Sequence, residues 1–508
     1  MNNFRKGAIS LLFGLTVSQV FFFFFVYQSN RTFYRRLLAV ADAGYLVIPG
    51  ERIMATLPDF LPAFYGALFF TFTLGISLSL FTLFMINRFQ VSGFKLGCWR
   101  QQGAWSRRIF VALCLVWIGS AVILAFDGIN PIITAWFLLV PVMITVGDRH
   151  GMMEYPGGKA WNTPDVWVVM AGAVFLFGQC LVQNPSSLLI DIRDKVLLST
   201  ETGRAINDFY YRYTLYAAEA IKSPHQKQIK TCRIDTELHA PLHDRLATVL
   251  AANDYLAVPV GVPTDLAVRP WEGGLTLSDG NRARMEISMD RLLSDTGGVL
   301  KAYSTRSDRN GLLRKYTAVG LLVSLLSVPV FLLYGAVLGL RAVFKRPSLA
   351  SPLAAVVCMV CAVLFPVLQG LHYAGDKFSE SELSQLLESE RESERISGLK
   401  ALVRQEGDIT RYPKYRFPEN PADMVERYWA LKALGRCKNA EAYQVVLKFK
   451  DDPHPNIQCI FLEALGRLGS KKDRGAILEK IKAAPNWYVQ WYAYQALKDL
   501  GWRQQKST

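Results

Sequence analysis

The last third of the chain contains a repeat that constrains the fold more than any other feature. Ala-Leu pairs recur at residues 401–402, 433–434, 464–465 and 496–497, at intervals of 32, 31 and 32 residues. Each pair lies near the end of an apolar stretch with helical spacing. Such a period is typical of stacked helical hairpins, which bury their apolar faces against their neighbours. We therefore expect an extended helical stack, a kind of surface that mostly binds proteins.

Aligning the tail on these pairs gives four units. Their helices are expected at residues 395–402, 427–434, 458–465 and 490–497, with apolar residues at the second, fifth and last positions. Gly435 and Gly466 directly follow the pair, where a left-handed residue often ends a helix. Stretches 441–449 and 474–481 supply the second helix of later units. In the first unit three prolines (Pro413, Pro418 and Pro421) predict a loop instead.

The tail resembles the HEAT-like repeat family, in particular the short bacterial type known from phycobilisome lyases. The best matches lie at residues 452–469 and 486–501, and the resemblance covers about residues 380–502. It implies an α-solenoid that contacts protein partners. Nothing in the sequence points to a bilin or to another cofactor.

The repeats carry many aromatic side chains, which dominate binding hot spots. The residues predicted to contact a partner are Trp487, Tyr488, Tyr428 and Trp429. The alternative is that aromatic rings fill the core of a small solenoid, and this alternative is favoured for Trp491.

The chain ahead of the repeats is strongly apolar. Hydrophobic residues make up 51% of the protein and charged residues 19%, and most of the net charge of +15 lies beside the apolar stretches. Seven stretches have the length and composition of membrane spans. They run over residues 8–27, 62–86, 109–126, 132–146, 166–182, 316–340 and 352–371.

The positive residues in the short loops favour a cytoplasmic N-terminus in the inner membrane of a bacterial cell. Seven spans would then place the middle segment and the repeats on the non-cytoplasmic side. No ionisable residue lies near the middle of a span, which weighs against proton-driven transport. Neither extramembrane segment has a concentrated basic face, so we expect no nucleic-acid partner.

Residues 184–315 are expected to form a small α+β domain. A helix is predicted over residues 190–222, rich in aromatic residues at 209–216, followed by strands near 255–260, 275–277 and 284–289 and a helix over 290–303. The aromatic residues suit either an anchor at a membrane interface or packing onto the sheet.

Metal and catalytic motifs are weak. His239 and His243 are four residues apart, but Pro241 lies between them, and a solvated loop is the preferred interpretation. Cys358 and Cys361 lie in an apolar stretch, where thiolates are disfavoured. No metal site, cofactor or catalytic residue is predicted, and enzymatic activity is left open.

Together these features predict a multi-span α-helical membrane protein with an inserted α+β domain and a C-terminal HEAT-like α-solenoid. The expected segments are 1–183 and 316–373 (membrane), 184–315 (α+β) and 374–508 (repeats). The leading hypothesis is a membrane scaffold that recruits partner proteins through the solenoid and contacts the lipid bilayer. A transporter or lipid-handling protein with regulatory repeats is the alternative, and a membrane-embedded enzyme is the third.

Overall fold

The computed structural model describes residues 2–89, 104–126, 130–149, 190, 193–280, 284–321, 323–324, 378–418, 420, 423–437 and 439–506. The chain divides into two compact units. Unit 1 comprises Met1–Gln28, Ala63–Leu188 and Arg309–Ala374, and unit 2 comprises Ser29–Pro62, Leu189–Asp308 and Gly375–Thr508. Helix α1 (Asn2–Asp42) contributes to both.

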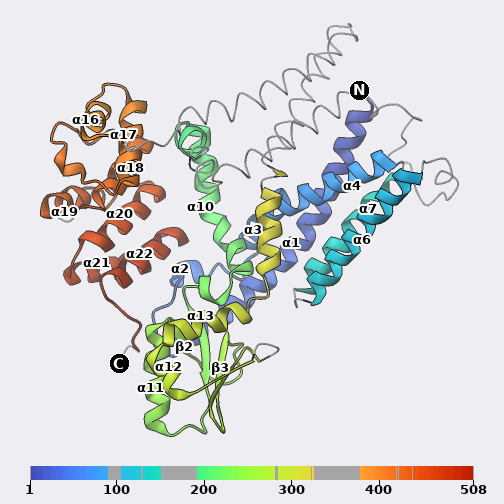
Figure 1. Cartoon of the computed structure of the whole chain (residues 1–508), viewed down its shortest axis with the longest axis horizontal. Coiled ribbons are helices and arrows are strands. Elements are labelled where there is room, and N and C mark those ends of the chain that lie inside the picture. The colour runs from blue at the N-terminus through green and yellow to red at the C-terminus, as the bar shows by residue number, and fades with distance from the viewer. Residues whose placement is uncertain are drawn as a thin grey trace. The chain divides into compact units, whose positions relative to one another are not determined.

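The repeats in unit 2 form an array of helices (Figure 1). The Ala-Leu pairs lie on α17 (Glu392–Arg404), α18 (Met424–Leu434), α20 (Pro455–Leu468) and α22 (Trp487–Asp499), each of which packs against the next. The accompanying helices are α16 (Glu380–Leu387), α19 (Ala440–Leu447) and α21 (Arg474–Ala483). Eight side chains of the pairs are at most 4% exposed, which confirms the expected inward face: Ala401, Leu402, Ala433, Leu434, Ala464, Leu465, Ala496 and Leu497.

The glycines after the Ala-Leu pairs serve packing, and the left-handed caps expected there are wrong. Gly435 has a φ of −62°, and Gly466 lies inside α20. A Cβ on Gly435 would lie 3.0 Å from the Cα of Ala464, and one on Gly466 would lie 2.8 Å from the Cα of Ala496. Each glycine therefore lets the next helix approach at its alanine, which explains why both recur in phase.

Between α17 and α18 the chain has no second α-helix among its described residues, as the prolines predict. One short 3-10 turn, η4 (Ile409–Arg411), interrupts this connection. The arginines that open the first two expected helices tie successive units together. Arg395 donates to both oxygens of Glu426 at 2.7 and 2.8 Å, and Arg427 is paired with Asp452.

The α+β domain of unit 2 is built on a five-stranded sheet of order β2-β1-β3-β4-β5. The strands are β1 (Lys230–Ile234), β2 (Tyr255–Ala257), β3 (Leu266–Trp271), β4 (Gly274–Ser278) and β5 (Arg284–Ile287). Strand β1 is parallel to β2 and β3, whereas β3, β4 and β5 are antiparallel. Helices α11 (Ala240–Ala252), α12 (Met289–Ser294) and α13 (Thr296–Arg306) bury Leu246, Leu292 and Tyr303 in its core.

The long predicted helix of this domain is divided into two. A π-helical turn, η2 (Arg193–Leu197), precedes α10 (Glu201–Ile221), whose N-cap is Thr200. The Thr200 hydroxyl accepts a hydrogen bond from the Gly203 backbone at 3.0 Å, which starts α10 as a capping threonine does.

Unit 1 is helical in its described part. Helix α3 (Phe60–Phe70), the π turn η1 (Thr71–Gly75) and α4 (Ile76–Phe89) follow one another, and the described part also contains α6 (Ala104–Phe126) and α7 (Pro131–Arg149). The Trp136 indole donates to the Ser18 hydroxyl at 3.0 Å, and its ring lies 4.7 Å from that of Phe22.

The prediction of a seven-span membrane protein is wrong. Among the described residues, two helices are long and apolar enough to cross a membrane, Ile9–Asp42 and Phe60–Leu83. Length and apolarity also suit a signal sequence or a core helix, and 61% of the most apolar window of Phe60–Leu83 is buried. The predicted inner-membrane location, with the α+β domain and repeats on the non-cytoplasmic side, loses its basis as well. Stretches 166–182 and 352–371, with most of 316–340, lie outside the described residues.

Candidate functional site

Within unit 2 the segment formed by η2 and α10 runs along the repeat array. Its contacts move to later repeats as the segment advances. Residues 193–194 contact α17 and α18, Asn207 contacts α20, and residues 211–216 contact α22. We name the array residues that make these contacts the α10-contact face: Lys400, Tyr428, Trp429, Asn456, Trp487 and Tyr488.

Asp194 anchors the start of this segment and is 3% exposed. Its Oδ2 accepts a hydrogen bond from the Trp429 indole at 2.8 Å and pairs with the Lys400 ammonium at 2.7 Å. Its Oδ1 accepts from the neighbouring Arg193 at 2.7 and 2.9 Å. Because a buried carboxylate is costly unless paired and hydrogen-bonded, three donors at this position make it a defined carboxylate site.

Arg193 also contacts the array through its own side chain. Its guanidinium carbon lies 4.0 Å from the centre of the Tyr428 ring. A guanidinium at this distance over an aromatic face is attracted by the ring quadrupole. The π-helical turn thus places a cation on Tyr428 and an anion on Trp429, two neighbouring residues of α18.

The middle of the segment is held by a pair of asparagines. The Asn207 amide donates to the Asn456 side-chain oxygen at 2.7 Å, and the two residues are 2% and 0% exposed. Asn456 Nδ2 and Asp208 Oδ1 are buried without a hydrogen-bond partner in the part of the chain that is described. An unmatched buried polar atom costs about 1–3 kcal/mol, so this stretch is less complementary than its ends.

Aromatic contacts hold the end of α10. The rings of Tyr211 and Tyr488 are 4.7 Å apart, and the Thr214 and Tyr488 hydroxyls are 3.1 Å apart. Burial raises the pKa of both tyrosines well above the ordinary value, so their hydroxyls stay protonated. Trp487 lies edge-on to Tyr216 at 5.2 Å and stacks on Phe33 at 5.8 Å.

The last helix of the array is held at its end by a second set of bonds, which we name the end contacts. The Gly50 backbone donates to the Gln490 side chain at 2.8 Å, and Gln504 both accepts from and donates to the Leu46 backbone, at 3.2 and 2.9 Å. Asp254 accepts from the Tyr494 hydroxyl at 2.5 Å and from the Lys498 ammonium at 2.6 Å. The array is therefore joined to the residue 43–50 connection and to the α+β domain.

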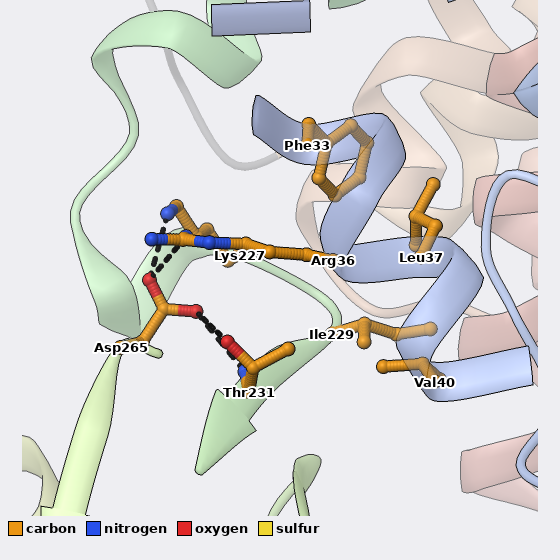
Figure 2. A pocket seen from close by; sticks show the side chains of 8 residues that line it. All are labelled: Phe33, Arg36, Leu37, Val40, Lys227, Ile229, Thr231 and Asp265. Atoms are coloured by element: carbon orange, nitrogen blue, oxygen red, sulfur yellow. Dashed lines mark hydrogen bonds and ion pairs between the residues drawn. The ribbon is translucent and has the colours of Figure 1, made fainter. Parts of the chain in front are cut away.

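A small pocket lies where the end of α1 meets β1 and the start of β3, lined by Phe33, Arg36, Leu37, Val40, Lys227, Ile229, Thr231 and Asp265. In Figure 2 the nitrogens of Arg36 and Lys227 converge on one oxygen of Asp265, while Thr231 bonds the other. The ion-pair distances are 2.7 Å to Arg36 and 3.0 Å to Lys227. Burial alone would raise the pKa of Asp265, but the two cations lower it well below the usual range.

The four residues predicted to contact a partner all lie on the α10-contact face. Trp487, Tyr428 and Trp429 are 3%, 6% and 7% exposed, and Tyr488 is half-buried. Each contacts another part of the same unit, so a partner that used them would have to displace those contacts. Their role toward another protein stays a prediction.

The weak metal candidates are placed on α11. His239 is the residue that precedes the helix and His243 lies in its first turn, because Pro241 occupies an early helical position, where its missing N–H is not needed. The expected loop is thus the start of a helix. Within the described residues no group of three or more potential metal ligands exists, and Cys358 and Cys361 lie outside them.

Sequence reasoning missed the carboxylate site of Asp194, which falls inside the single helix expected over residues 190–222. For the aromatic residues of this helix it predicted either an anchor at a membrane interface or packing onto the sheet. Neither prediction includes contact with the array. Tyr211 and Tyr216 contact the array, and Tyr210, which is 46% exposed, interacts with Tyr488. The segment's pairing with distant repeats has no local pattern from which it can be read.

Comparison with known families agrees with the repeat architecture. The family described as HEAT repeats matches residues 419–500, which cover α18 to α22. HEAT repeats generally mediate protein–protein interactions. No curated protein and no solved structure matches the chain.

Proposed function

We propose that this protein is a scaffold that binds partner proteins through its HEAT-like array. The observation that carries the proposal is the α10-contact face, along which consecutive repeats hold a helical segment of the same unit. A surface that binds a helix in this way carries the tyrosines and tryptophans that dominate binding hot spots. The match to HEAT repeats supports the same conclusion.

The finer assignment to the short bacterial type of repeat is part of the proposal and is supported by the period of 31 to 32 residues. The seven-span architecture expected from the sequence is not part of the proposal. A scaffold of this kind needs no catalytic group, and all of the contacts that support it lie within unit 2.

The direct test is site-specific photo-crosslinking in cells with the full chain. A photoreactive amino acid replaces Lys432, Glu463 or Gln495 on the helices that carry the α10-contact face, or the exposed Gln444 or Lys448 on and beside α19. A matched control replaces the exposed Arg245 on α11. The proposal expects specific proteins trapped at array positions. Trapping from Arg245 alone, with none from the array, would contradict it.

Deleting the array is a poorer test. Removal of α22 also removes Tyr494 and Lys498, and with them the bonds to Asp254. Loss of partners would then report damage to the α+β domain as well as loss of the array.

A further inference from the structure

We infer that the α10-contact face is an exchangeable receptor for helical segments of partner proteins that begin with an acidic side chain, with η2 and α10 as its resident occupant. This inference rests on the proposed scaffold function and names the chemistry of the partner. The resident segment shows which contacts a competing segment has to reproduce.

The array provides an acid-specific anchor by itself. The Trp429 indole and the Lys400 ammonium, both from the array, converge on one oxygen of Asp194 at 2.8 and 2.7 Å. Hydrogen bonds that involve charged groups are roughly twice as strong as neutral ones, so a carboxylate is favoured over an amide of the same shape. Any Asp or Glu side chain presented there by a partner meets the same two donors.

The second requirement is an aromatic helix at a fixed distance from the acid. Tyr488 contacts Tyr211 and Thr214, whereas the anchor holds Asp194. The acid and the aromatic contact thus lie 17 to 20 residues apart, most of them helical. This spacing separates specific segments from acidic peptides in general.

The resident segment is imperfectly matched to the array, which favours exchange. On the array side, Asn456 Nδ2 is buried without a partner among the described residues. Apolar side chains of α10 also remain accessible to solvent, since Ile206 and Phe209 are 56% and 40% exposed. Contiguous exposed apolar patches mark surfaces that interact with other proteins, membranes or ligands.

The test uses the full chain and a fluorescent peptide with the sequence of residues 193–216, measured by anisotropy. The host carries Asp194→Asn, which weakens the resident segment and leaves Trp429 and Lys400 in place. Because the resident competes at high effective concentration, we expect this host to bind the peptide at least about tenfold more tightly than wild type does. A second host, Asn207→Ala, loses the hydrogen bond between the resident segment and Asn456. This host is also expected to bind the peptide more tightly than wild type does.

Two comparisons make the result decisive, once circular dichroism shows that each host is folded. A peptide carrying Asp194→Asn is expected to bind at least about tenfold more weakly, and Lys400→Met added to the host is expected to reduce this preference, because the Trp429 indole remains as a donor. Equal binding of the two peptides, or no binding to either loosened host, would overturn the inference. If partners are still trapped from the array in cells, the scaffold function survives that failure.

Discussion

The array is held by the rest of unit 2 in two places, and the two are built differently. Along its face, η2 and α10 contribute aromatic rings, one buried carboxylate and an asparagine pair that leaves Asn456 Nδ2 unmatched. At its end, both polar atoms of the Gln490 side chain and of the Gln504 side chain are bonded, while Gln228, which donates to the Trp491 backbone, leaves its Oε1 unmatched among the described residues. Asp254 also uses both of its oxygens.

This difference separates a replaceable contact from a permanent one. Aromatic area and a single charge can be supplied by many helices, whereas the end contacts need the backbone of Leu46 and Gly50 at fixed positions. Buried polar groups that are fully paired specify one arrangement, because breaking any of them leaves an unmatched partner. The face is therefore suited to exchange, and the end is suited to fix the array.

The largest effect is expected from Trp487→Ala, since Trp487 contacts both Tyr216 of α10 and Phe33 of α1. Truncating a buried tryptophan costs about 3–5 kcal/mol of unfolding free energy. Urea denaturation measures this, with Trp271→Ala as a control at a tryptophan that is 44% exposed. If Trp487→Ala and Trp271→Ala lost similar amounts of unfolding free energy, Trp487 would not pack against both Tyr216 and Phe33.

Asp265→Asn tests the ion pairs that fix the Ser29–Pro62 segment to the sheet. The variant leaves Arg36 and Lys227 facing a neutral side chain, at a cost of about 3 kcal/mol near neutral pH. Because the pKa of Asp265 is lowered on folding, its stabilisation is complete above about pH 4 and is lost as the pH falls toward the folded value.

The variant should therefore lack part of the acid-induced loss of stability seen in wild type. Urea unfolding from pH 7 to pH 2 measures how the unfolding free energy of wild type and of the variant depends on pH. The exposed Asp290→Asn is the control. A constant difference between Asp265→Asn and wild type at every pH would contradict the ion-pair role.

Asp254→Ala tests the end contacts directly. It removes the acceptor of the buried Tyr494 hydroxyl and of Lys498, and we expect a loss of about 2–3 kcal/mol. Asp254 also has a φ of +64°, so Asp254→Gly should recover about 1 kcal/mol of backbone strain. Thermal unfolding of both, beside the exposed Asp244→Ala, separates the lost bonds from the strain.

Gly466→Ala tests the stacking on which both contacts depend. Its Cβ would lie 2.8 Å from the Cα of Ala496, and overpacking of this kind costs about 1–3 kcal/mol. Gly475→Ala is the matched control, because nothing lies within 4 Å of a Cβ there, and it should stabilise the protein by about 0.4–1 kcal/mol. If both substitutions stabilise the protein, the close approach of α20 and α22 at this glycine is wrong.

The array was predictable because its pattern is local and repeated. Four copies fix the phase of the Ala-Leu pairs, so the buried face follows from helical spacing alone. The glycines were misread for the same reason, since a cap is a local explanation and a neighbour's Cα is not visible in one repeat. Only the aligned stack shows Gly435 against Ala464 and Gly466 against Ala496.

The membrane prediction failed because apolar composition does not say what covers a helix. In unit 1, Phe22 is buried against Phe70 and Trp136 of the same unit. Strands β1 and β3 were missed since Lys230, Arg233 and Arg269 interrupt their apolar alternation. The anchor at Asp194 depends on residues more than two hundred positions away, which a single sequence does not reveal.

Amide hydrogen exchange on the full chain tests whether the α10 contact opens separately from the end contacts. We expect the amides of α10 to exchange through a partial opening whose free energy lies at least about 2 kcal/mol below that of global unfolding. The amides of β1 and α22 should exchange only through global unfolding. Asp194→Asn should lower protection in α10 alone. Exchange of α10, β1 and α22 with one common free energy, in wild type and variant, would contradict separate opening.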